Sequence, residues 1–240
     1  FTLKGYEITI NYSEDKQEVL KVLNKKDFDV ALENTIKAFV NEEDYQKYLE
    51  GKQSKITTTG STIKDINIRE NITIKESYLS TEDNIFTNST DLSKYLLFGT
   101  TQTQGTHIVI GGQTVKEIAE EYELNTKEFL IVNPSILSEN TLLYSGQEVN
   151  VGLIKPIVSV VVENNLIEDK EVSYKRDVKY DNKLVVGTTY TEQQGQNGVS
   201  RVEYYTETIN GTITKVIPIN NEIITPVVNE VVVKGGLAIN

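Results

Sequence analysis

The last third of the chain has a pattern that excludes long helices. Beyond Pro156, β-rich runs recur every ten to fifteen residues and are separated by Gly and Asn, which favour turns. The runs cover residues 157–163, 172–174, 183–186, 202–208, 213–217 and 227–233. None of them places apolar residues at helical spacing. We therefore expect residues 156–236 to form an extended all-β module.

Composition excludes several classes of function. The 240 residues include 35 Asp and Glu, 24 Lys and Arg, one His and no Cys, so a disulfide scaffold and a thiolate metal site are both excluded. His107 alone cannot supply the two or three imidazoles of a catalytic zinc site, and we expect no metal and no cofactor. The net charge of −11 argues against nucleic acid as a partner, and no apolar run is long enough to span a membrane.

The first 99 residues mix both element types, so we expect an α+β leader domain over residues 1–99. Alternation predicts strands at residues 3–10 and within residues 61–75. Helices are predicted from Ser13 through residue 23, after Asp27, from Asn41 to Gly51, and after Asp91. The polar stretch at residues 100–105 has no periodicity and is predicted to be a linker.

Residues 106–152 predict a compact β-α-α-β unit. A strand over residues 107–110 leads through Gly111 and Gly112 into a helix with apolar spacing. Thr126 is predicted to cap a second helix, which Pro134 stops because proline cannot continue a helix. A turn at residues 144–147 then leads into a last strand over residues 148–151.

This unit resembles a LysM domain. The motif residues, at the family's spacing, are His107, Val109, Gly112, Gln113, Thr114, Val115, Ile118, Ala119, Asn133, Pro134, Leu143, Gly146, Gln147, Val149 and Val151. His107 replaces the usual aromatic residue, and Gln113 replaces an Asp. The resemblance implies a groove for N-acetylglucosamine-containing glycans such as peptidoglycan. One implied wall is Gly112, Gln113, Thr114 and Val115, and the other is Asn133, Pro134, Ser135 and Ile136.

A structural interpretation of the same residues stays open. Gly112 and Thr114 are also the residue types that a turn and a helix N-cap require. Asn133 and Pro134 are equally explained as a helix stop. The unit would then be a degenerate LysM fold without a ligand, and His107 would be a packed strand residue.

Residues 156–236 resemble the five-glycine (G5) domain of Gram-positive surface proteins. The resemblance rests on short signals around Pro156, Gly195, Gly198, Asn210-Gly211 and the closing Gly235. It implies either a second glycan contact or a stiff spacer. A LysM domain followed by a G5 domain resembles the non-catalytic front of lysostaphin-type metallopeptidases, whose zinc domain would follow Asn240 or be lost.

The resulting expectation is a multidomain α+β segment that binds peptidoglycan and carries no catalytic residues. It would anchor a surface protein or a hydrolase at the cell wall of a Gram-positive bacterium, outside the cell. Two alternatives are a structural component of a phage tail tip or cell-surface assembly, and a glycosidase with an unrecognised acid pair. The acidic runs at residues 42–44 and 120–121 lie on predicted helix surfaces, which favours solvated charges over a catalytic pair.

Overall fold

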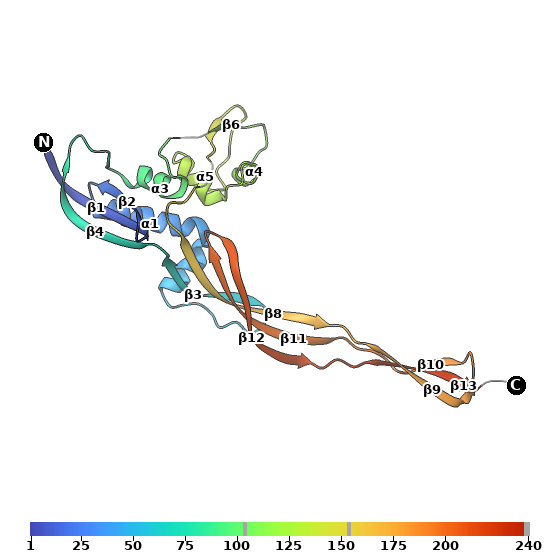
Figure 1. The fold of residues 1–240 in the computed structure, drawn as a ribbon. Coiled ribbons are helices and arrows are strands. Elements are labelled where there is room, and N and C mark those ends of the chain that lie inside the picture. The colour runs from blue at the N-terminus through green and yellow to red at the C-terminus, as the bar shows by residue number, and fades with distance from the viewer. Residues whose placement is uncertain (103–104, 153–154, 238–240) are drawn as a thin grey trace. The chain divides into compact units, whose positions relative to one another are not determined.

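The computed structural model describes residues 1–102, 105–152 and 155–237. The chain is mixed α/β, with 47% strand and five helices in this described part. It divides into two compact units (Figure 1). The first contains residues 1–52, 65–162 and 208–212, and the second contains residues 53–64, 163–207 and 213–240. Of the predicted linker 100–105, residues 103 and 104 lie outside the described residues.

The first unit opens with a four-stranded sheet in the order β4-β1-β2-β5. Strand β1 (Thr2–Ser13) pairs antiparallel with β2 (Lys16–Val22) and with β4 (Asn71–Ser80), while β5 (Ile85–Phe86) is parallel to β2. Side chains of alternating residues on β1 and β2 are buried under two helices, α1 (Lys25–Phe39) and α3 (Ser89–Phe98). This core includes Ile8, Ile10, Leu20, Val22, Phe28, Ala31, Leu92 and Leu96.

The predicted helix at residues 13–23 is wrong. These residues form the turn and second strand of a hairpin, with Ile8 opposite Leu20 and Ile10 opposite Glu18. Leu20 and Val22 are buried and Val19 is 45% exposed, which is the alternation of a strand. Glu14 and Asp15 therefore belong to a tight turn rather than to the first turn of a helix.

The short helix α2 (Glu42–Leu49) has the predicted cap: the Asn41 side chain accepts hydrogen bonds from the backbone N–H groups of Glu43 and Asp44. Two other predicted caps are displaced. Asn88, not Asp91, caps α3. Asn125, not Thr126, caps the helix that begins at residue 126. In each case the true cap is an Asn whose side-chain oxygen accepts a bond from the backbone N–H three residues later.

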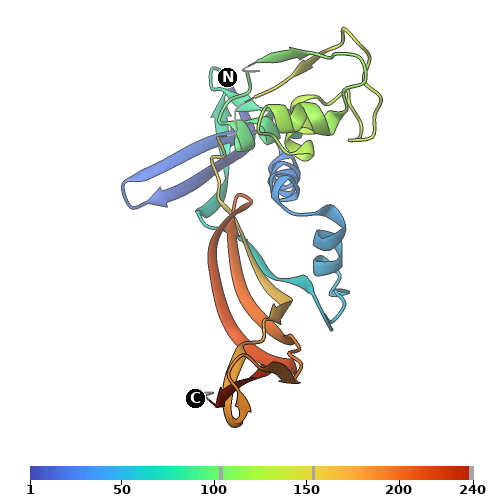
Figure 2. The same cartoon turned by 90° about the vertical axis from the view of Figure 1, so that its right-hand side faces the viewer.

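Residues 106–150 form strand, helix, helix and strand in that order. Strands β6 (Thr106–Ile108) and β7 (Glu148–Asn150) pair antiparallel, and helices α4 (Val115–Glu121) and α5 (Thr126–Val132) lie between them in sequence (Figure 2). Asn133 ends α5 just before Pro134, as predicted. The core of this β-α-α-β segment is continuous with the leader, because Ala38 of α1 and Leu97 and Phe98 of α3 belong to the same buried cluster.

The second unit contains strands and no helix among its described residues. Strands β12 (Thr212–Thr225), β11 (Gly198–Ile209), β8 (Val160–Val172) and β3 (Gly60–Ile68) make one sheet in that order. A three-stranded sheet has the order β10-β13-β9, built from Thr189–Gln193, Glu230–Leu237 and Arg176–Val185. Most side chains of β9, β10 and β12 are exposed, so this unit buries little apolar surface.

Gly235 of β13 lies so close to β9 that a Cβ atom there would be 2.0 Å from the Val185 carbonyl oxygen. No helix in the described ranges is long and apolar enough to cross a membrane.

Candidate functional site

A groove of about 650 Å³ lies on the β-α-α-β segment. One wall is the loop between β6 and α4, and the other is the loop that precedes β7. The lining residues are Gly112, Gln113, Thr114, Lys116, Thr126, Glu139, Asn140, Thr141, Leu142 and Leu143. The volume lies in the range of small-ligand pockets, about 300–1,000 Å³. We refer to this pocket as the groove.

Gln113 is held in the groove wall by its own side chain. Its Oε1 atom accepts a hydrogen bond from the backbone N–H of Ile110 at 2.8 Å, and it lies 2.9 Å from Nε2 of His107. The other ring nitrogen of His107 lies 3.0 Å from the Tyr122 hydroxyl, and the two rings meet edge to face. An amide oxygen can only accept, so in this contact the Nε2 atom of His107 is the hydrogen-bond donor. His107 and Gln113 therefore contact each other directly.

Thr114 has a structural role at the start of α4. Its hydroxyl accepts from the Glu117 backbone N–H, while its own N–H donates to the Glu117 carboxylate at 2.8 Å. This reciprocal pair is a capping box, and the hydrogen bond from the Thr114 N–H lowers the pKa of Glu117. Gly112 has φ +89°, in the left-handed region that favours glycine. Val115 is fully buried beneath the wall and does not reach the groove.

The second predicted wall does not line the groove. Asn133 is 5% exposed, and its side chain ties α5 to β7 through bonds to the carbonyls of Phe129 and Asn150 and from the Asn150 N–H at 2.7 Å. Ile136 is also buried, and Pro134 and Ile136 line a different pocket beside Leu137. Ser135 is exposed in the same loop. Residues 139–143 take their place along the groove.

Residues 139–143 line the groove but were not predicted from the sequence, which has no specific signal there. Glu139, Asn140 and Thr141 are consecutive polar residues, followed by Leu142 with 82% of its surface exposed. Single exposed leucines are common on protein surfaces, so Leu142 does not by itself mark a binding surface. The family motif points to the Asn-Pro pair at the beginning of the loop, whereas the groove uses the middle of the loop.

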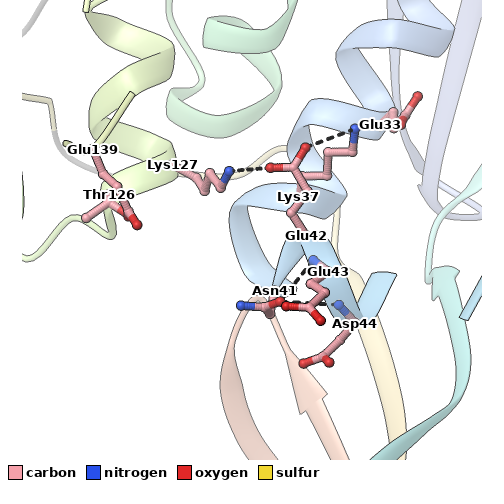
Figure 3. Close-up of polar contacts among 9 residues, drawn as sticks. All are labelled: Glu33, Lys37, Asn41, Glu42, Glu43, Asp44, Thr126, Lys127 and Glu139. Atoms are coloured by element: carbon pink, nitrogen blue, oxygen red, sulfur yellow. Dashed lines mark hydrogen bonds and ion pairs between the residues drawn. The ribbon is translucent and has the colours of Figure 1, made fainter. Parts of the chain in front are cut away.

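A second polar pocket, of about 490 Å³, lies where α1 turns into α2 (Figure 3). We call it the corner pocket; its walls are residues 37–43, 125–127 and Glu139. Lys127 of α5 donates to the Glu42 carboxylate at 2.7 Å, and this hydrogen bond lowers the pKa of Glu42. Lys37 pairs with Glu33 at 2.8 Å and lies 3.8 Å from Glu42. Of these, the Lys127–Glu42 ion pair joins the leader to the β-α-α-β segment.

Glu128 is the one acidic residue among the buried residues of α5. It is 1% exposed, and its Oε2 accepts from the Asn125 backbone N–H at 2.7 Å in a second capping box. Burial raises the pKa of Glu128 to about 7, while the hydrogen bond from Asn125 acts in the opposite direction. The residue lines a shallow pocket with Phe39 and Leu124, away from the groove.

Comparison with known proteins identifies the strand-rich part of the chain. The G5 domain family matches residues 163–236. These residues are a G5 domain. The sequence prediction of a G5 module is thus confirmed over this range, which is about a third of the chain. G5 domains are typically associated with cell-wall or peptidoglycan-related proteins.

A solved structure described as "IgA1 Protease G5 domain structure" is similar to the chain at 14% identity. The match covers 33% of this chain and 93% of that one, with a TM-score of 0.23. Among curated proteins, none matches this chain. The LysM resemblance of residues 106–152, and its glycan-binding residues, stay predictions.

Proposed function

We propose that this segment is a non-catalytic binding module for cell-wall glycan, with a LysM-type unit at residues 106–152 that takes N-acetylglucosamine-containing strands such as peptidoglycan. It acts outside the cell, at the wall of a Gram-positive bacterium, and positions a surface protein or a hydrolase there. The G5 domain supports this proposal because of the class of protein in which such domains are found.

The observation that carries the proposal is the groove between residues 112–114 and 139–143. An acetamido group presents one N–H and one C=O, and both need partners when the sugar leaves water. The groove supplies the exposed backbone of Gly112 and the amide of Asn140. It also contains the hydroxyl of Thr141, which accepts a hydrogen bond from the Ser138 N–H at 3.1 Å. Leu142 and Leu143 add an apolar surface for the methyl group and the sugar ring.

Binding to purified peptidoglycan sacculi tests the proposal. The full chain should sediment with sacculi and release no soluble fragments, since it is proposed to bind without cleaving. Leu142→Asp should abolish most of this binding, because a charge replaces the apolar wall. Leu142 is 82% exposed, so the fold has no need of it.

Leu137→Asp is the matched control. Leu137 lies in the same loop and is 89% exposed, but it does not line the groove. The two variants have the same charge and the same type of substitution. Equal sedimentation of both variants with sacculi would contradict the groove as the binding site.

A second candidate function is structural. Thr114 and Asn133 are two residues of the LysM motif. The side chain of Thr114 caps a helix, and the side chain of Asn133 accepts a hydrogen bond from strand β7. This supports a scaffold role in a tail-tip or cell-surface assembly. Stable ring-shaped or filamentous oligomers in mass photometry, without sacculus binding, would favour this candidate.

A further inference from the structure

The groove and the corner pocket share part of their walls. Thr126 and Glu139 line both of them. The groove belongs to the β-α-α-β segment, whereas the corner pocket includes residues 37–43 from the end of α1 and the start of α2. A polar path therefore leads from the groove, over these two side chains, onto the leader.

The carboxylate of Glu139 lies where the groove and the corner pocket meet. The Thr126 hydroxyl donates to its Oε2 at 2.9 Å. Within the described residues, no lysine or arginine forms an ion pair with Glu139, whereas Glu42 pairs with Lys127 and Glu43 pairs with Lys47. A carboxylate has about four lone-pair positions, so the bond from Thr126 leaves further acceptor positions on Glu139, which lines both pockets.

The leader side of the corner pocket carries groups of the same chemistry. Glu43 of α2 pairs with Lys47 at 2.6 Å and is still exposed over 76% of its side chain. Across the pocket, Lys127 of α5 is exposed over 39%. The pocket thus contains carboxylate acceptors and an ammonium donor, and this polar lining suits a ligand rich in hydroxyl and amide groups. A sugar polymer has these groups on every residue and has the length to occupy two adjoining pockets.

We propose that the corner pocket is a second subsite for the same glycan strand, contributed by the leader. The strand lies in the groove, passes over Thr126 and Glu139, and meets Glu43 at the start of α2. Glu139 accepts hydroxyl or amide protons at the crossing point. This inference rests on the proposed function of the groove, and it assigns a ligand contact to residues 37–43.

The test is the dependence of affinity on oligosaccharide length, measured by calorimetry on the full chain with a chitin disaccharide and a chitin hexasaccharide. Glu43→Leu removes an acceptor from the corner pocket and leaves the groove intact. We expect hexasaccharide affinity to fall about tenfold, as for the loss of one hydrogen bond to a charged group, and disaccharide affinity to stay unchanged. Glu139→Gln keeps the shape of the junction and should also weaken hexasaccharide binding.

Glu50→Leu is the matched control on the same helix. Glu50 is the C-cap residue of α2, is 51% exposed in its side chain, and lines none of these pockets. Its variant should bind both oligosaccharides as the unchanged chain does. Unchanged hexasaccharide affinity in Glu43→Leu and Glu139→Gln would overturn the second subsite while leaving the groove in place. Failure of the unchanged chain to bind either oligosaccharide or sacculi would overturn the function of the groove, and the subsite with it.

Discussion

The buried carboxyl of Glu128 makes the stability of the first unit depend on pH in an unusual direction. In the folded chain its pKa is about 7, against an ordinary value of 4.5. Between these two values the folded state keeps a proton that the unfolded state has lost. Stability from this group is therefore complete below pH 4.5 and is lost as the pH rises through 7. The difference in pKa corresponds to about 3 kcal/mol across that range.

Glu128→Gln isolates this contribution. Gln keeps the shape and can still accept the hydrogen bond from the Asn125 N–H, so the capping box is preserved. Gln does not ionise, so the variant lacks the loss of stability between pH 4 and pH 8. Relative to the unchanged chain, the free energy of unfolding of the variant should rise by about 3 kcal/mol over that interval.

Denaturant unfolding at several pH values, followed by the helical circular dichroism signal, measures this difference. All helices of the described residues lie in the first unit, so the signal reports that unit. Glu117→Gln is the matched control, because Glu117 has the same place in the other capping box but a lowered pKa. Its variant should lose stability relative to the unchanged chain as the pH rises through the carboxylate range, with no further change above it. Parallel pH profiles for Glu128→Gln and the unchanged chain would refute the buried-acid explanation.

Two further substitutions test the packing within each of the two units. Asn133→Ala removes the hydrogen bonds that the Asn133 side chain makes between α5 and β7, and it leaves the Asn150 N–H without its partner. We expect a loss of about 2–4 kcal/mol in the free energy of unfolding, measured in the same assay. A loss below about 0.5 kcal/mol would show that these bonds are dispensable. Gly235→Ala places a Cβ 2.0 Å from the Val185 carbonyl oxygen, which must part β13 from β9. Amide hydrogen exchange should then lose protection in these two strands only, and retained protection would mean that the backbone shifts without cost.

Sequence alone predicts the elements that local signals define. Asn41 followed by three acidic residues gives the start of α2, and Pro134 gives the end of α5, because caps and prolines act within a few residues. The sequence predicts a helix where residues 13–22 form part of a hairpin, because Glu14 and Asp15 suit both a turn and the start of a helix. These residues form a strand because they pair with β1, and this pairing is not a local property of the sequence.

The site was harder to predict than the fold for the same reason. The wall at residues 112–114 follows from the motif, because the turn and the helix cap are both local. The pairing of His107 with Gln113 depends on the strand bringing the ring over the loop, so neither residue alone indicates it. The corner pocket joins residues 37–43 to residues 125–127, which lie more than eighty positions apart in the chain.

The continuous core of the first unit determines how the molecule can be dissected. Ala38, Leu97 and Phe98 pack among the side chains of the β-α-α-β segment. A fragment of residues 106–152 expressed alone would present this apolar surface to water and lose the Lys127–Glu42 ion pair. Weak ligand capture by such a fragment would then reflect a damaged scaffold, and only pieces that retain α1 and α3 can report the affinity of the intact molecule.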